Sequence, residues 1–188
     1  MRMEGFMMLE LVAEKLTACF DKRLTLSEIE RLKMILGFES LLHQFVLIGI
    51  IIIFACVLEI VRPVTLFLAV FGTYRTFAGG FHLSTSLRCT IATTAIMIIG
   101  TKLALAISMK IGATFLIWAV ILVIVWFYVP RLTSNHPIEQ EQCKKLKAKT
   151  VWLVVLLGII AVINPWETRE IISMAAMIET FTLIPKPE

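Results

Sequence analysis

The residues best suited to chemistry in this chain of 188 residues lie between Arg75 and Cys89. The segment contains Gly79, Gly80 and His82 in surroundings that are otherwise mostly apolar. A cysteine with a histidine near it supplies a thiol nucleophile and a base that can activate it. Polar groups are costly at membrane depth, so we expect His82 and Cys89 to have a functional role rather than a packing role.

The spacing of His82 and Cys89 predicts a break in the helix between them. On one continuous helix the two residues share a face but lie about 10 Å apart along the axis. A base must come within about 2.6–3.2 Å of the proton that it takes. Gly79 and Gly80 permit backbone conformations closed to other residues, so the helix can end there. We therefore expect an interruption between Gly79 and Ser86 that brings His82 toward Cys89.

Cys89 is expected in the first turn of the helix that follows the break. Ser86 is a suitable N-cap residue, and with Ser86 as the cap Cys89 falls in that turn. The helix dipole and the unpaired N–H groups there favour a thiolate and can hold a developing oxyanion. Arg75 and Arg88 add positive charge on either side. The alternative, a packed cysteine near a hydrogen-bonded histidine, stays open.

The composition is that of an integral membrane protein, because 59% of the residues are hydrophobic and 17% are charged. Soluble domains are about a quarter charged. The N-terminus has no signal-peptide pattern, and the four cysteines show no paired spacing that would indicate a disulfide framework. A metal site could add His136 and Cys143 to the pair above, but no two of these residues have short metal-site spacing. We expect no metal and no other cofactor.

The hydrophobic pattern predicts an all-α integral membrane fold with about six transmembrane or re-entrant helices. Two N-terminal amphipathic interfacial helices are expected before them, at 4–20 and 26–38, and Ser27 and Glu30 have capping-box spacing in the second. A helical hairpin packed on the rest of the protein explains these two helices equally well. Apolar runs follow at roughly 41–61, 64–78, 89–108, 111–130, 150–164 and 170–184, and a full span needs about 20 residues.

Six crossings are preferred, with four crossings and re-entrant pieces as the alternative. The chain is expected to form one membrane domain, 1–188. Its parts are an amphipathic cytoplasmic-face region 1–40, spans over 41–130, a basic cytoplasmic loop 131–149 and C-terminal spans over 150–184.

Basic residues predict the orientation of these spans. With six spans and a cytoplasmic N-terminus, fourteen of the 18 basic residues face the cytoplasm. The four on the outer side are Arg62, Lys102, Lys110 and Arg169. Because cytoplasmic loops are enriched in Lys and Arg, we expect a multi-pass protein of the cell membrane with segment 75–89 toward the cytoplasmic face.

A lysine cluster closes the predicted basic loop. It consists of Lys144, Lys145, Lys147 and Lys149. Such a cluster beside a membrane helix binds anionic lipid headgroups or docks an acidic peptide, and the two explanations are compatible.

Segment 75–89 resembles the signature of the accessory gene regulator B family, the AgrB-type membrane endopeptidases of Gram-positive bacteria. The matching residues are Arg75, Gly79-Gly80-Phe81-His82 and Cys89. Three weaker elements agree with it over nearly the whole chain. They are Leu36-Gly37-Phe38-Glu39, Val129-Pro130 with His136-Pro137-Ile138, and Ile178-Glu179 with Thr182-Leu183-Ile184-Pro185.

The resemblance implies a thiol protease of quorum sensing. Such an enzyme removes the acidic C-terminal tail of an AgrD-like pro-peptide through a cysteine acyl-enzyme and leaves an autoinducing peptide closed as a thiolactone or lactone. It implies Cys89 as the nucleophile and His82 as the base, with Arg75 and Gly80 at positions associated with function. Glu39 matches a position that is Gln or Glu in the family. Its side chain would orient His82 or have an interfacial or structural role. The lysine cluster would hold the acidic tail.

Two other functions stay open on the sequence. A non-enzymatic peptide transporter or exporter subunit would use the Gly-Gly break as a broken-helix substrate site, although no repeat relates the two halves of the chain. A lipid-binding or scaffolding protein would use the lysine cluster alone. A homodimer would suit a short bundle with a polar interior, and the sequence does not fix it. No nucleic-acid partner is expected.

Overall fold

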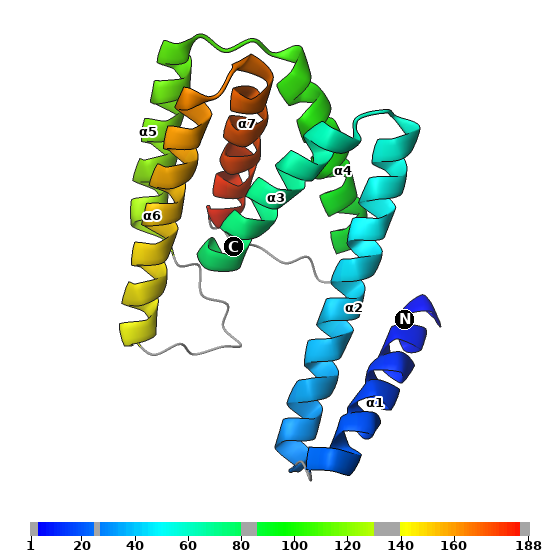
Figure 1. Cartoon of the computed structure of the whole chain (residues 1–188). Coiled ribbons are helices and arrows are strands. Elements are labelled where there is room, and N and C mark those ends of the chain that lie inside the picture. The colour runs from blue at the N-terminus through cyan, green and yellow to red at the C-terminus, as the bar shows by residue number, and fades with distance from the viewer. Residues whose placement is uncertain (1–3, 25–26, 80–85, 130–139, 185–188) are drawn as a thin grey trace. The chain divides into compact units, whose positions relative to one another are not determined.

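The computed structural model of the chain describes residues 4–24, 27–79, 86–129 and 140–184. All seven described elements are helices, which confirms the predicted all-α fold (Figure 1). They are α1 (Glu4–Leu24), α2 (Glu28–Val57), α3 (Val61–Ala78), α4 (Ser86–Ala106), α5 (Ile111–Tyr128), α6 (Gln140–Ile163) and α7 (Trp166–Leu183). The chain divides into two compact units, 1–53 and 54–188.

The first unit contains α1 and most of α2. Phe20 of α1 stacks on Phe38 of α2, with the ring centroids 5.8 Å apart. The predicted capping box begins α2, because the Ser27 N–H donates to the Glu30 carboxylate at 3.0 Å and the Ser27 hydroxyl does so at 2.7 Å. In return, the Glu30 N–H donates to the Ser27 hydroxyl at 3.4 Å. These reciprocal contacts satisfy backbone groups that the helix start leaves unpaired and fix where α2 starts.

The two helices predicted at 26–38 and 41–61 are one helix of 30 residues, α2. Between them the sequence has Glu39 and Ser40, neither of which breaks a helix, so the helix continues. The prediction of two separate amphipathic helices before the first span is therefore wrong. One separate helix, α1, precedes α2, and residues 28–38 belong to the same helix as the apolar run that follows them.

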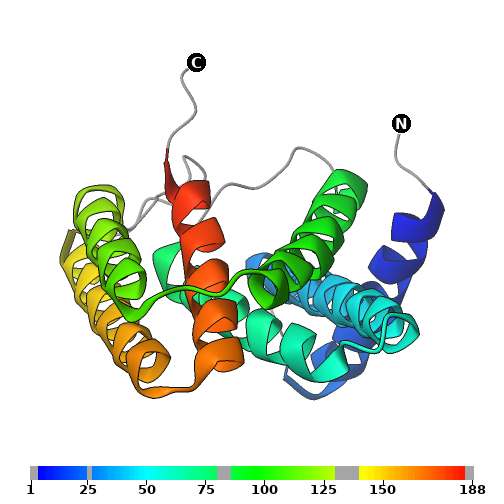
Figure 2. The same ribbon diagram turned by 90° about the horizontal axis from the view of Figure 1, so that it is seen from above.

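The second unit is built around α7, which packs against α3, α4, α5 and α6. Viewed from above, α7 lies between α4 and the pair α5–α6 (Figure 2), and α3 packs against both α7 and α6. The middle of α7 is buried continuously from Glu170 to Ala176, and Glu179, Thr180 and Leu183 are buried further along. A helix buried on so much of its surface depends on its neighbours rather than on lipid for its surroundings.

Polar side chains of α7 bind these neighbours. Trp118 of α5 donates its Nε1–H to the Ser173 hydroxyl at 3.1 Å. The backbone N–H of Met109, between α4 and α5, donates to Glu170 Oε1 at 2.9 Å. Buried polar groups are costly unless they are paired, so these contacts make the arrangement around α7 specific.

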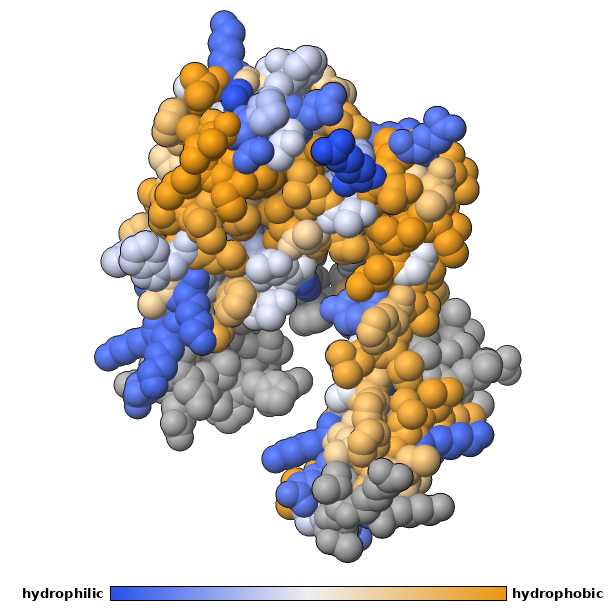
Figure 3. Space-filling view, in the orientation of Figure 1, coloured by the Kyte–Doolittle hydropathy of each residue, from blue (hydrophilic) through white to orange (hydrophobic). Residues whose placement is uncertain are grey.

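Four helices are long and apolar enough to cross a membrane, namely α2, α4, α5 and α6. This finding agrees with a membrane protein. The six predicted runs all appear as helices, but α3 and α7 do not meet the same criteria, so a count of six crossings is not confirmed. On the face of the second unit shown in Figure 3, apolar residues dominate between helix ends where hydrophilic residues gather.

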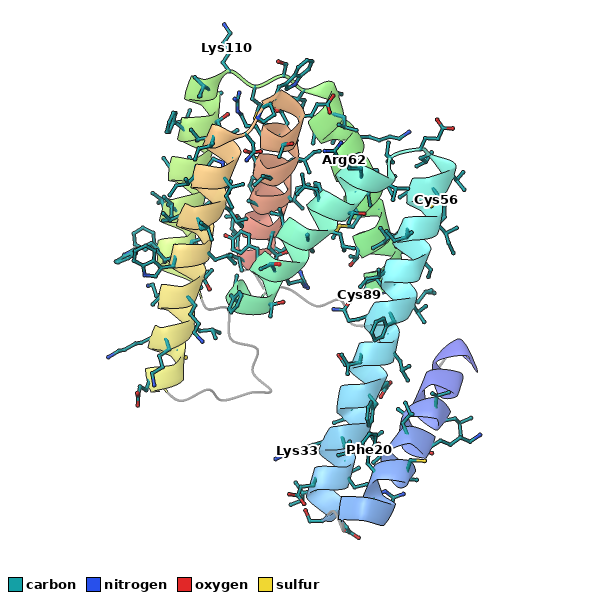
Figure 4. The ribbon with its side chains drawn as sticks, viewed as in Figure 1. Phe20, Lys33, Cys56, Arg62, Cys89 and Lys110 are labelled. Atoms are coloured by element: carbon teal, nitrogen blue, oxygen red, sulfur yellow. The ribbon has the colours of Figure 1, made fainter. Side chains whose placement is uncertain are left out.

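Consecutive helices of the second unit run in alternate directions (Figure 1). At one end, α3 ends and α4 and α6 begin; we call this the site end. The connections 107–110 and 164–165 lie at the opposite end. Figure 4 shows Lys110 at the opposite end, whereas Cys89 lies toward the site end.

Candidate functional site

The break predicted after α3 is present. The helix ends at Ala78, and Gly79 follows with φ 77° and ψ −158°. Residues other than glycine rarely adopt this backbone conformation, which explains why a glycine occupies this position. The Gly79 N–H donates to the Arg75 carbonyl at 3.0 Å and completes the last turn. The next described residue is Ser86, the first of α4.

Cys89 is the fourth residue of α4 and lies in its first turn, as predicted. Its side chain is half-buried, and the sulfur lies 4.0 Å from the Thr93 hydroxyl. The first four N–H groups of a helix have no partner within that helix, so this turn can offer donors to a substrate carbonyl. Ser86 was predicted as the residue before the helix, but it is the first helical residue.

Gly80 and His82 lie outside the described residues. The approach of His82 to Cys89 therefore stays a prediction. His136, considered as a metal ligand, also lies outside them. Within the described part of the chain, no three His, Cys, Asp or Glu side chains gather as metal ligands would.

Arg75 lies in the last turn of α3 and forms an ion pair across the second unit. Its Nη1 is 3.3 Å from Glu179 Oε2 of α7, and its guanidinium lies 5.9 Å from the centre of the Phe71 ring. The neighbouring Tyr74 hydroxyl is 2.9 Å from the Thr180 hydroxyl. The site end of α3 is thus held on α7 by two adjacent polar contacts.

Glu39 belongs to the first unit, where it is half-buried on α2, whereas Cys89 belongs to the second. Its suggested role of orienting His82 stays a prediction. This role is supported only by the match of Glu39 to the Gln/Glu position of the family.

The lysine cluster lies on a helix rather than in a loop. The predicted loop 131–149 is wrong over its last ten residues, because α6 begins at Gln140. Glu, Gln, Lys and Ala favour helices, and Lys145 forms an i, i+4 ion pair with Glu141 at 2.8 Å. The Lys147 ammonium lies 5.0 Å from the centre of the Trp126 ring of α5. Lys144 and Lys149 are exposed on the same turns.

The partner of Arg75 is a residue that sequence reasoning did not assign to the site. Glu179 is separated from Arg75 by 104 positions and is fully buried. The available signal was the presence of Glu170 and Glu179 inside the apolar run 170–184, since charged residues inside such runs face the interior of a bundle and usually have partners. That signal indicates a buried carboxylate without naming what binds it.

A model of the accessory gene regulator B family matches residues 13–183 of this chain. The chain belongs to the accessory gene regulator B family. The match extends from α1 to the last residue of α7, so both units are part of the family's fold.

Relatives over nearly the full length agree with this assignment. The chain is 27% identical over 172 residues to accessory gene regulator protein B of Staphylococcus intermedius, covering 92% of each chain. It is 27% identical over 184 residues to an AgrB-like protein of Lactiplantibacillus plantarum, covering 96% of this chain and 91% of the relative. An AgrB-like protein of Clostridium acetobutylicum is 25% identical over 179 residues. No solved structure matches the chain.

Membership of this family gives the chain a role in the accessory gene regulator quorum-sensing system. It also links the chain with the AgrD propeptide of that system.

Proposed function

We propose that this protein is a membrane cysteine endopeptidase that removes the acidic C-terminal tail of a quorum-sensing pro-peptide. The observation that carries the proposal is the place of Cys89, in the first turn of α4 directly after the break that begins at Gly79. A thiol in a first helical turn lies next to unpaired N–H groups and the positive end of the helix dipole. These features suit both a nucleophile and the oxyanion that its attack creates.

The reaction begins when the Cys89 thiolate attacks the carbonyl carbon of the peptide bond before the tail. The C–N bond then breaks, and protonated His82 gives its proton to the departing amine, so the tail leaves with a free amino terminus. The product on the enzyme is a thioester between Cys89 and the shortened peptide. Neutral His82 takes the proton of a thiol or hydroxyl of that peptide, and its sulfur or oxygen attacks the thioester carbonyl. The C–S bond to Cys89 then breaks, which releases the thiolactone or lactone and restores the Cys89 thiolate beside protonated His82.

The site end also offers a binding surface for the acidic tail of the substrate. The lysine cluster lies in the first turns of α6, and α6 and α4 begin at the same end of the second unit (Figure 1). Its positive charge suits an acidic tail. The apolar helices around the site exclude water from the acyl-enzyme, which favours ring closure over hydrolysis. We place this end toward the cytoplasm, because the lysine cluster is the densest basic region of the described chain.

Tail release by the purified protein tests the proposal. The protein in nanodiscs is incubated with the pro-peptide, and mass spectrometry follows the free tail and an acyl adduct on Cys89. Cys89→Ala and His82→Ala should abolish both, whereas Cys143→Ala should retain them. Cys143 is a matched control because it is also half-buried and lies near the start of α6 at the same end. Undiminished cleavage by Cys89→Ala would exclude the mechanism, and peptide transport without cleavage would support a transporter.

A further inference from the structure

Two consecutive residues of α3 bind two consecutive residues of α7. Arg75 Nη1 donates to Glu179 Oε2 at 3.3 Å, and the Tyr74 and Thr180 hydroxyls are 2.9 Å apart. Tyr74 and Glu179 are fully buried, and Thr180 is 1% exposed. Two adjacent contacts fix both the rotation and the height of a helix against its neighbour. The last turn of α3 therefore has one defined position on α7.

Arg75 also forms the end of α3 through its backbone. Its carbonyl accepts the Gly79 N–H at 3.0 Å, and Gly79 is where the chain leaves the helix with φ 77°. Arg75 therefore contacts Glu179 through its side chain and Gly79, where the helix ends, through its backbone carbonyl. A shift of Arg75 would move that point.

The same short stretch of α7 contacts the helix that carries Cys89. Ile178 precedes Glu179, and its Cδ1 would lie 3.1 Å from a Cβ atom built on Gly100 of α4. Residues 178–180 of α7 therefore meet both α3 and α4. The two helices that flank the candidate site share one support.

Burial of the Glu179 carboxylate costs free energy that an apolar side chain at this position would not. Its side chain is 0% exposed, and its Oε1 has no hydrogen-bond partner among the described residues. A buried ion pair is often no more stabilising than apolar residues of similar volume. What the pair supplies in addition is a directional contact, which apolar residues do not provide.

We propose that Glu179 is a positioning residue for the reaction, and this inference rests on the endopeptidase activity proposed above. Glu179 holds the Arg75 guanidinium, and Arg75 holds the end of α3 where the chain departs at Gly79 toward α4. Its role is to hold the end of α3 in a fixed position relative to Cys89 at the start of α4. It does not touch the substrate.

A double-mutant cycle on tail release tests this inference. The variants are Glu179→Gln, Arg75→Gln and the two combined, each assayed for kcat, for KM with the pro-peptide and for thermal unfolding. Misplaced catalytic groups reduce turnover more than binding, so Glu179→Gln should lower kcat on the order of 10- to 100-fold with KM within about threefold of wild type. Because the pair acts as a unit, the combined variant should be no slower than Arg75→Gln alone.

Glu170→Gln is the matched control. Glu170 lies on the same helix, is also fully buried and also has one carboxylate oxygen without a partner among the described residues, but it binds Met109 at the opposite end. It should lower the unfolding temperature about as much as Glu179→Gln and leave kcat within about twofold of wild type. Parallel losses of kcat and unfolding temperature in both variants would reduce Glu179 to a structural residue.

Two further outcomes would overturn the inference. Additive losses in the cycle would show that Arg75 and Glu179 act separately. If Glu179→Gln does not fold, Glu179→Asp keeps the charge but shortens the reach, and wild-type kcat in that variant would exclude positioning by this contact. If the wild-type protein releases no tail, the proposed activity itself is excluded. Tail release by the wild-type protein is therefore measured before the variants are compared.

Discussion

The sulfur of Cys89 and the hydroxyl of Thr93 lie 4.0 Å apart, one helical turn from each other on α4. The hydroxyl can donate to the sulfur when the thiol has lost its proton. We therefore expect Thr93→Val to slow both alkylation of Cys89 by iodoacetamide and tail release. A lost hydrogen bond of about 0.5–1.5 kcal/mol corresponds to roughly two- to tenfold. Site-resolved mass spectrometry of the alkylated protein gives the rate for Cys89 alone.

Two variants serve as controls for this prediction. Thr93→Ser keeps the hydroxyl and should retain the wild-type rate. Thr94→Val changes the next residue, whose Oγ1 is buried without a partner among the described residues, and should leave Cys89 unaffected. Equal rates in Thr93→Val and wild type would show that the contact has no chemical role.

Replacing the four lysines of the cluster with glutamine should weaken substrate binding without slowing the chemical step. Exposed ion pairs contribute about 0.2–1 kcal/mol each, so we expect KM for the pro-peptide to rise roughly tenfold. The rise should shrink at high ionic strength, because salt screens exposed charges. Measurements of KM and kcat over a salt series test this, with Lys102→Gln/Lys110→Gln as the control. A fall in kcat at constant KM would contradict a tail-binding role.

Gly100 is required because α4 approaches its neighbours closely at this residue. A Cβ atom there would lie 2.8 Å from Phe67 Cζ and 3.1 Å from Ile178 Cδ1. We expect Gly100→Ala to destabilise the protein by about 1–3 kcal/mol through overpacking. Gly72→Ala is the control, since nothing lies within 4 Å of its added Cβ. Thermal unfolding in one detergent should show a loss for the first variant and none for the second.

Trp118 should stabilise the second unit through its indole N–H as well as through its ring. Trp118→Phe removes the 3.1 Å bond to Ser173 and should cost about 1 kcal/mol beyond the loss of contact area. Trp152 is 74% exposed, so Trp152→Phe should change stability little. In a cycle with Ser173→Ala, additive losses in unfolding free energy would show that the bond contributes nothing.

The sequence carried enough information to predict the elements of the fold but not all of their ends. Apolar runs marked each helix from α2 to α7, and the Ser27–Glu30 capping box and the break at Gly79 follow from local backbone chemistry. The start of α6 was missed because a basic composition was interpreted as a loop. Lysine is in fact a good helix former, and charge indicates exposure rather than irregular structure.

The contacts of the candidate site depend on pairings between distant parts of the chain. The place of Cys89 in its first turn could be predicted from neighbouring residues. The pairing of Arg75 with Glu179 could not, because it spans 104 positions and depends on how α3 crosses α7. A charged residue inside an apolar run predicts that a partner exists, but only packing decides which one.

The place of α7 in the chain sets the order in which the bundle is assembled during translation. The helices that surround it, α3 to α6, are all synthesised before it. By length and composition α7 is not among the helices apolar enough to cross a membrane. We therefore expect it to enter last, against partners already present, through small-residue packing and interhelical hydrogen bonds. A ribosome stalled before Trp166 would leave the four surrounding helices without the helix that joins them.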